Sequence, residues 1–398
     1  MKRTLDHNGG SPQAISTTIL WRSLIGAIAC VTVFDVTLGF TFPLLTLLLE
    51  AAKVDETMIG LNAAMTPLGI LIMGPFIPAL TRRFGARPVA LVSACGVAGM
   101  LLMLKLFPSL PSWFFLRLIL GAVGGILFTI SEAWVVRFAE GPDRTKILAI
   151  YASVLSGGFA VGPFLIPFTG IHGWLPFAIA AGCALIVMLP VLMINSPDAP
   201  VAEGEHMTFW AFLPKAPVLL CAVGVFALFD AVSLAFFPIY ALRVGLDLDT
   251  ASFALGVLIA GNVFLQLPLG WLADRWSRIG TMIGCALVTA VFCAILPMTM
   301  GTIFMWPVLV VMGTTGFGVY TVALALLGER FSGQALVAGA AAFAAMWGAG
   351  AIIGPPAAGG VIKWFGVEAL PYFLGLIYLV YGLAFMARQW SRRNAVQA

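Results

Sequence analysis

The chain has 398 residues, of which 61% are hydrophobic and only 10% are charged, and its mean hydropathy is +1.05. Soluble domains are close to half apolar and about a quarter charged, and even large domains leave much of their chain facing water. Lipid must therefore be part of the solvent, which excludes an extracellular disulfide scaffold, a nucleic-acid binder and a disordered regulator. The formal net charge of +4 is small, so the positions of the basic residues carry more information than their sum.

Twelve apolar segments are each long enough to cross a bilayer, because a spanning helix needs about 20 mainly apolar residues. They cover roughly residues 23–49, 57–81, 88–107, 113–137, 147–169, 173–194, 216–242, 250–272, 279–300, 303–328, 335–362 and 369–388. The polar stretch 195–215 separates an N-terminal half (23–194) from a C-terminal half (216–388), and residues 1–22 and 389–398 form polar tails. The sequence thus predicts an all-α integral membrane protein with twelve transmembrane helices in two six-helix pseudo-repeats.

The basic residues predict the orientation in the membrane. Most of the 21 Lys and Arg residues fall on the side that holds both termini, and only Lys53, Lys105, Arg243 and Lys363 fall on the other side. Lys and Arg accumulate in cytoplasmic loops. We therefore expect both tails and the loop 195–215 to be cytoplasmic.

The cysteines indicate no special chemistry. Six of them are scattered singly through apolar runs, without a CxxC or Cys/His pattern. Such cysteines are usually small core residues, so we expect no disulfide, no metal and no cofactor.

The two halves repeat one another at a nearly fixed offset. Asp35 recurs as Asp230, 195 residues later. Further matches share an offset of 192 residues: Arg83 with Arg275, Gly121 with Gly313, Gly124 with Gly316, and Gly162-Pro163 with Gly354-Pro355. Parallel repeats of this kind place a central site between two halves that move against each other.

The segment Gly270–Arg278, which reads GWLADRWSR, resembles the GxLaDRxGrr loop of the major facilitator superfamily. The resemblance to this family covers the whole chain. In the first-half copy of the loop Pro78 and Arg82 replace the Gly and the Asp, while Arg83 and Arg87 are kept. The resemblance implies that these loops control the change of conformation, through Gly270, Asp274, Arg275, Arg278, Arg83 and Arg87.

Three further elements are similar to motifs of this family. Arg117-x3-Gly121-x2-Gly124 resembles an element common in proton-coupled members, and Asp35-x-Thr37 followed by Pro43 is similar to a motif of drug–proton antiporters. Half of an antiporter signature is present as Gly158-x3-Gly162-Pro163. Because small residues allow helices to approach closely, we expect the following residues to act in helix packing: Gly158, Gly162, Pro163, Gly354 and Pro355.

Four charged residues lie within predicted spans, namely Asp35, Arg117, Glu132 and Asp230. Ionisable groups inside a membrane are usually functional, so all four are candidates for proton coupling. Counting about 1.5 Å per residue places Asp35 and Arg117 within about 6 Å in depth, which predicts an ion pair that is either a coupling device or a permanent structural tie. Asp230 lacks such a partner because Leu309 stands where the first half has Arg117, and it is either a proton carrier or a remnant of duplication.

Glu132 lies near the predicted inner face. It either pairs with Arg137 or Arg144, or forms an inner proton-exit or substrate-cation site together with Trp134.

A substrate cavity needs groups that can bind a solute. Asn262 and Gln266 are four residues apart and share a helix face, and Asn62 and Thr66 form a similar pair. They either bind substrate or join helices by hydrogen bonds. Aromatic side chains are lining candidates as well as packing residues, and the full cavity set is Asn262, Gln266, Asn62, Thr66, Phe128 and Trp134.

These observations favour a secondary transporter that exports a small organic solute by alternating access, driven by protons. No GxxxxGK[ST] loop for ATP is present, and an enzyme is disfavoured because the three histidines fall in predicted loops. The alternatives are a nutrient symporter or uniporter, and a non-transporting receptor or assembly factor. We expect the bilayer, protons and a small solute as partners, no nucleic acid, and a functional monomer; the resemblance implies a bacterial inner membrane.

Overall fold

The computed structural model describes residues 17–138, 144–194 and 212–397, and every regular element in this part of the chain is helical. The predicted all-α fold is therefore confirmed. The first half contains α1 (Thr17–Ala51), α2 (Glu56–Met73), the 3-10 turn η1 (Gly74–Phe76), α3 (Ile77–Phe84), α4 (Ala86–Leu106), α5 (Leu110–Phe138), α6 (Arg144–Phe164), α7 (Ile166–Thr169), α8 (Leu175–Ile186) and α9 (Met188–Met193). The second half contains α11 (Pro217–Arg243), α12 (Leu248–Arg275), α13 (Arg278–Thr299), α14 (Met305–Arg330), α15 (Gly333–Phe365) and α16 (Ala369–Gln397). Most of the predicted loop 195–215 and of the N-terminal tail lies outside the described residues.

Eleven helices in the described part of the chain are long and apolar enough to cross a membrane. The predicted span 147–169 corresponds to α6 and α7, where the apolar stretch Ser153–Thr169 is shorter. The twelfth span and the orientation of the termini thus stay predictions.

Prolines interrupt segments that the sequence presents as continuous. The predicted span 57–81 is divided into α2, η1 and α3, and Pro75 and Pro78 stand in the first turns of η1 and α3. In the same way α6 gives way to α7 ahead of Pro167. Proline has no N–H to donate and its ring clashes with the carbonyl four residues earlier, so the helix changes direction at these points.

The internal repeat is visible in the packing of the helices. A Cβ atom on Gly121 of α5 would collide with the Thr66 carbonyl of α2, and one on Gly313 of α14 would collide with the Leu258 carbonyl of α12. Both contact residues of the second pair lie 192 residues after those of the first. Each half therefore contains the same close helix crossing, which only a residue without a side chain permits.

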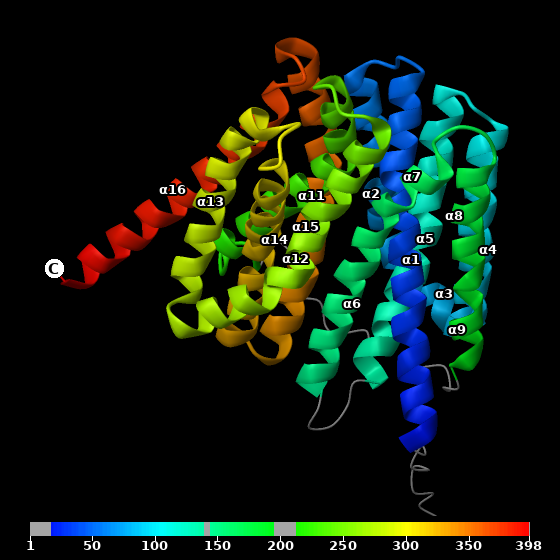
Figure 1. Cartoon of the computed structure of the whole chain (residues 1–398). Coiled ribbons are helices and arrows are strands. Elements are labelled where there is room, and N and C mark those ends of the chain that lie inside the picture. Colours follow the sequence, from blue (N-terminus) through cyan, green and yellow to red (C-terminus); the bar gives the residue numbers. More distant parts are fainter. Residues whose placement is uncertain (1–16, 139–143, 195–211, 398) are drawn as a thin grey trace, which may run out of the picture.

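Ion pairs join the two halves at one end of the bundle, which we call the Arg243 end (Figure 1, where α1 and α2 meet α11 and α15). Arg243 contacts Glu50 at 2.7 Å and Glu56 at 2.8 Å, and Lys363 contacts Asp55 at 2.7 Å. We call the opposite end, which holds the α12–α13 junction, the Arg278 end. The halves are thus tied together at the Arg243 end.

The close packing between halves continues below these ion pairs. Gly60 of α2 meets the Pro355 carbonyl of α15, and Gly256 of α12 packs on the ring of Phe164 at the end of α6. The contacts lie in the halves of these helices that lead to the Arg243 end. They close that end of the bundle with backbone and aromatic contacts as well as with charge.

Candidate functional site

Arg117 lies in a buried polar group on α2 and α5. Its side chain is 1% exposed; Nη1 donates to Asn62 Oδ1 at 3.1 Å and Nε donates to Thr66 Oγ1 at 3.4 Å. The guanidinium also lies over the ring of Phe42, 5.5 Å from its centre. The predicted residues Asn62 and Thr66 therefore accept hydrogen bonds from Arg117. The close approach of α2 to α5 at Gly121 brings these side chains within reach.

The expected ion pair between Asp35 and Arg117 is not formed, although both residues are described. Gly124 packs on the ring of Phe34, which places Asp35 about two turns, or about 10 Å, from the level of Arg117. The depth count, which measured from the apolar limits of each span, placed the two residues too close together, and the Arg117 guanidinium is bonded to Asn62 and Thr66 instead. Asp35 is only 2% exposed, and its Oδ2 atom has no hydrogen-bond partner in the described part of the chain.

Asp35 belongs to a different group of side chains. It interacts electrostatically with Glu132 of α5, and Tyr151 of α6 interacts with both carboxyl groups and with Tyr320 of α14. Tyr320 also interacts with Glu132. We call these four residues, Asp35, Glu132, Tyr151 and Tyr320, the acidic cluster. It draws on three helices of the first half and one of the second.

The acidic cluster contains no compensating charge among the described residues. Glu132 is exposed and forms no ion pair with a described side chain; the side chain of its suggested partner Arg144 lies outside the described set. The hydroxyl of Tyr151 is buried without a partner, like Oδ2 of Asp35. Tyr320 stacks on Phe226 with ring centres 4.6 Å apart. An arrangement of two carboxyl groups and two aromatic hydroxyls can bind protons or a cation.

Tyr151 was missed by the sequence reasoning, and Tyr320 was considered only among the aromatic residues that either pack or line a cavity. A single tyrosine within an apolar run has no spacing partner that would mark it. All 6 tyrosines of the chain lie inside expected spans, so position within a span does not single out these two.

Asp230 on α11 is also buried, at 9% exposed, and forms no ion pair within the described residues. Its surroundings differ from those of the first half, because the counterparts of Arg117, Asn62 and Thr66 at an offset of 192 are Leu309, Ala254 and Leu258. The buried polar group of the first half is therefore replaced by an apolar one. This agrees with the expectation that Asp230 lacks a cationic partner at Leu309.

The amides of α12 make single hydrogen bonds. Asn262 donates to Ser156 of α6 at 3.5 Å, and Gln266 donates to Thr321 of α14 at 3.3 Å. The Asn262 Oδ1 and Gln266 Oε1 atoms have no partner among the described groups. The carbonyl oxygens of both amides are thus free acceptors among the described groups. The hydrogen bond from Asn262 to Ser156 links the two halves.

The two aromatic candidates take part in packing. Trp134 is 6% exposed within the apolar core, and the ring of Phe128 lies 6.5 Å from that of Phe34. These contacts are those of core side chains.

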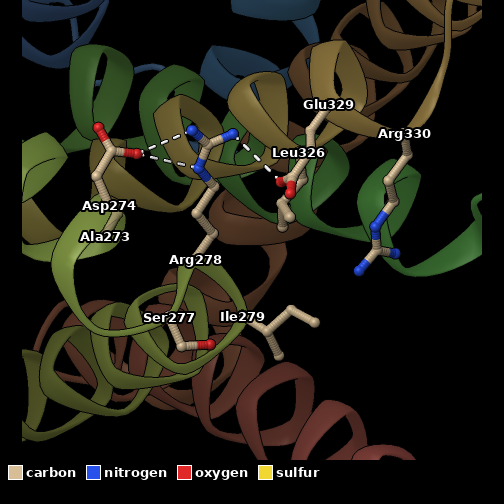
Figure 2. Close-up of a pocket in the computed structure, with 8 residues that line it drawn as sticks. All are labelled: Ala273, Asp274, Ser277, Arg278, Ile279, Leu326, Glu329 and Arg330. Carbon is tan, nitrogen blue, oxygen red and sulfur yellow. Dashed lines mark hydrogen bonds and ion pairs between the residues drawn. The ribbon is translucent and has the colours of Figure 1, made fainter.

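The loop after α12 forms an ion network at the Arg278 end. Arg278 donates to Asp274 at 2.9 Å and 3.1 Å and to Glu329 of α14 at 3.2 Å (Figure 2). These residues border a cavity of about 470 Å³. Arg275 lies over the ring of Trp271, 5.6 Å from its centre. No side chain contacts the place where a Gly270 Cβ would lie.

The basic residues of the corresponding loop in the first half make contacts of a different kind. Arg83 lies over the ring of Phe84 at 5.2 Å, and Arg87 donates to the Leu192 carbonyl at 2.8 Å. Arg83 and Arg87 thus contact an aromatic ring and a backbone carbonyl, whereas Arg278 in the second-half loop contacts two carboxylates.

The Gly-Pro elements of α6 and α15 lie at helix contacts. Gly158 meets the Thr32 carbonyl, Gly162 meets the backbone of Gly39, and Gly354 packs on Leu228. Pro163 and Pro355 stand inside α6 and α15, next to these glycines. The elements bring α1 against α6 and α11 against α15.

Comparison with known proteins agrees with this architecture. The chain is 25% identical over 373 residues to the uncharacterized MFS-type transporter YfkF of Bacillus subtilis, covering 89% of this chain and 93% of the relative. It is 26% identical over 298 residues to the MFS-type transporter Ent638_1421 of Enterobacter, covering 72% and 74%. Two crystal structures of the nucleoside transporter NupG superpose with TM-scores of 0.77 and 0.73 at 14% and 13% identity, covering 92% and 93% of this chain and 99% of NupG; at this identity they show the fold.

A model of the Major Facilitator Superfamily matches residues 25–320 and 218–395, so this protein belongs to the major facilitator superfamily and is a multi-pass membrane transporter.

Proposed function

We propose that the protein exports a small organic solute in exchange for protons, by alternating access across a bacterial cytoplasmic membrane with both termini in the cytoplasm. The observation that carries the proposal is the acidic cluster, in which Asp35 is buried with an unpartnered oxygen. A carboxylate without a counter-ion is expensive inside a membrane, and binding a proton removes its charge. Asp35 is therefore the coupling group, and Glu132, which is exposed, connects it with water.

Alternating access gives the ion pairs at the Arg243 end a role. In the proposed orientation this end faces outward, so the structure corresponds to a state closed to the outside. Arg243 and Lys363 hold Glu50, Glu56 and Asp55 across the two halves. Opening to the outside requires that these pairs separate.

The remaining charged groups take supporting roles. Arg117 supplies a fixed positive charge about two turns from Asp35. Asp230 is a second proton site in the other half, where no cation among the described residues balances it. Asn262 and Gln266 offer free acceptors to a solute between the halves.

The proposal is tested with the purified protein in proteoliposomes. Counterflow and pH-gradient-driven transport are measured against a panel of lipophilic cations, organic acids, sugars and nucleosides. Asp35→Asn should keep counterflow and lose transport driven by the gradient, whereas Asp249→Asn, at an exposed position in the first turn of α12, should keep both. Gradient-driven accumulation by Asp35→Asn contradicts coupling through Asp35, solute movement in the same direction as protons contradicts efflux, and absence of flux for every solute favours a receptor.

A further inference from the structure

A small basic pocket lies at the Arg278 end, apart from the acidic cluster. It is bordered by the start of α11, the end of α14 and the last turns of α16, and its volume is about 50 Å³. Three of its residues are cationic, Lys215, Arg330 and Arg388, and none of the residues that line it is acidic. These cations come from three separate segments of the second half.

Two of the three cations have no partner of opposite charge among the residues that the structure describes. Within the described part of the chain, Arg330 and Arg388 form no ion pair. Figure 2 shows the reason for Arg330: the neighbouring Glu329 turns toward Arg278, and the guanidinium of Arg330 points away from that network. The acid that could neutralise Arg330 is thus already engaged elsewhere.

Two further features suit this pocket to a negatively charged group. Helix α11 begins at Pro217 after Ala216, which offers no side-chain cap, so the positive end of the dipole of a 27-residue helix faces the pocket. Apart from Gln389, the rest of the lining is apolar, with Phe385 at 5% and Leu219 at 2% exposed. A helix N-terminus alone binds nothing in particular, but here it adds to a pocket that already contains unpaired cations.

The pocket lies where lipid headgroups lie. Arg330 is the last residue of α14, and Arg388 is near the end of the apolar stretch Ala369–Ser391. These positions mark the boundary between the hydrocarbon and the polar region of the bilayer. The small volume suits one phosphate group and not a whole solute.

We propose that the pocket formed by Lys215, Arg330, Arg388 and the start of α11 binds the phosphate of an anionic phospholipid headgroup, with the acyl chains against the apolar lining around Phe385. Basic pockets between transmembrane helices recognise such headgroups by charge. Bound lipid would tie α16 to α11 and α14. This inference does not depend on the proposed direction of transport or on proton coupling.

The test uses the full-length protein in detergent, with lipid retention measured by native mass spectrometry. Phosphatidylglycerol is compared with phosphatidylcholine of the same acyl chains. The wild type should prefer the anionic lipid, and Arg330→Gln/Arg388→Gln should weaken that preference about thirtyfold, since each surface cation near anionic lipid contributes about a fivefold factor and the two factors multiply. Arg330→Lys/Arg388→Lys should retain most of the preference because it retains both charges.

A matched control separates the pocket from the general charge of this end of the bundle. Arg22→Gln/Arg83→Gln removes two basic residues at the same end but from α1 and α3, and it should leave the preference unchanged. Equal retention of the two lipids by the wild type overturns the proposal, as does a control that loses as much preference as the pocket variant. Saturation of the pocket by millimolar inorganic phosphate without a preference for phosphatidylglycerol assigns the pocket to free phosphate and also overturns it. Elution in gel filtration shows that each variant is folded.

Discussion

Arg243 on α11 holds Glu50 on α1 through two hydrogen bonds, from Nε at 2.7 Å and from Nη2 at 2.9 Å. The same guanidinium reaches Glu56 on α2 with Nη1 at 2.8 Å. One side chain of the second half thus joins two helices of the first half. Because the pair is partly exposed, each contact contributes modestly, about 0.2–1 kcal/mol.

Arg243→Gln should therefore shift the population toward the state open at the Arg243 end, by roughly twofold to thirtyfold for the loss of two such contacts. Spin labels at Ala52→Cys and Glu368→Cys, both exposed at this end, report the separation of the halves by pulsed electron resonance. Lys105→Gln removes a charge at the same end without an ion pair in the described chain and should leave the distances unchanged. Identical distance distributions in Arg243→Gln and wild type contradict a role for Arg243 in closure.

The contact between Asp55 and Lys363 predicts a defined pH response. Hydrogen bonding to Lys363 lowers the pKa of Asp55, and the N–H of Thr57 adds to the effect. A lowered carboxyl pKa means that the contact is fully present above the ordinary value near 3.9 and is lost only as the pH falls through the lowered pKa. We expect the same label distances throughout the physiological pH range, with separation only under strongly acidic conditions. A separation that follows the pH near neutrality contradicts this and makes Asp55 part of the coupling.

The contribution of Arg117, Asn62 and Thr66 to stability can be tested by replacing them with the residues found at the equivalent positions of the second half. Arg117→Leu leaves Asn62 and Thr66 buried without their partner, which should destabilise the protein by about 1–3 kcal/mol per group. The triple variant Arg117→Leu/Asn62→Ala/Thr66→Leu copies Leu309, Ala254 and Leu258, and should recover most of the thermal stability. The readout is the midpoint of thermal unfolding in detergent. If the triple variant is less stable than the single one, the group contributes more than its internal hydrogen bonds.

The same triple variant separates stability from coupling. If the charge of Arg117 assists Asp35, the variant should fold yet show a changed pH dependence of gradient-driven transport. An unchanged pH profile restricts Arg117 to joining α2 and α5.

The close helix crossing predicts a position-specific response to one methyl group. Gly121→Ala and Gly313→Ala place a Cβ against a backbone carbonyl that cannot move aside, so both should lower the midpoint of thermal unfolding. Gly99→Ala is the matched control, because nothing lies within 4 Å of its Cβ position, and alanine favours a helix over glycine by about 0.8–1.0 kcal/mol. The control should therefore equal or exceed the wild type. Similar losses in all three variants contradict the crossing as the cause.

The helices and the repeat could be predicted from the sequence because lipid imposes a long apolar run on every span, and because the offset of 192 residues is preserved at the contact residues. The proline interruption at Pro75 lies inside an apolar run, so hydropathy alone does not mark it. The register between α1 and α5 was mispredicted because polar residues mark where a span leaves the lipid and not where its helix ends.

The candidate site was predictable only in part for a related reason. Asp35 and Glu132 are marked by charge in an apolar setting. Tyr151 and Tyr320 come close to these carboxyl groups because α6 and α14 pack near α1 and α5. No spacing pattern in the sequence links these positions.

The matching crossings at Gly121 and Gly313 also make the two halves interchangeable scaffolds. The backbone that presents Arg117, Asn62 and Thr66 recurs around Leu309, Ala254 and Leu258, so polar chemistry can be added to or removed from one half without changing its shape. Placing Arg, Asn and Thr at positions 309, 254 and 258 would create an equivalent buried positive charge in the second half, about two turns from Asp230. In such a variant the buried cation would lie near the aspartate of both halves, or of the second half alone, while the helices and their crossings stayed the same.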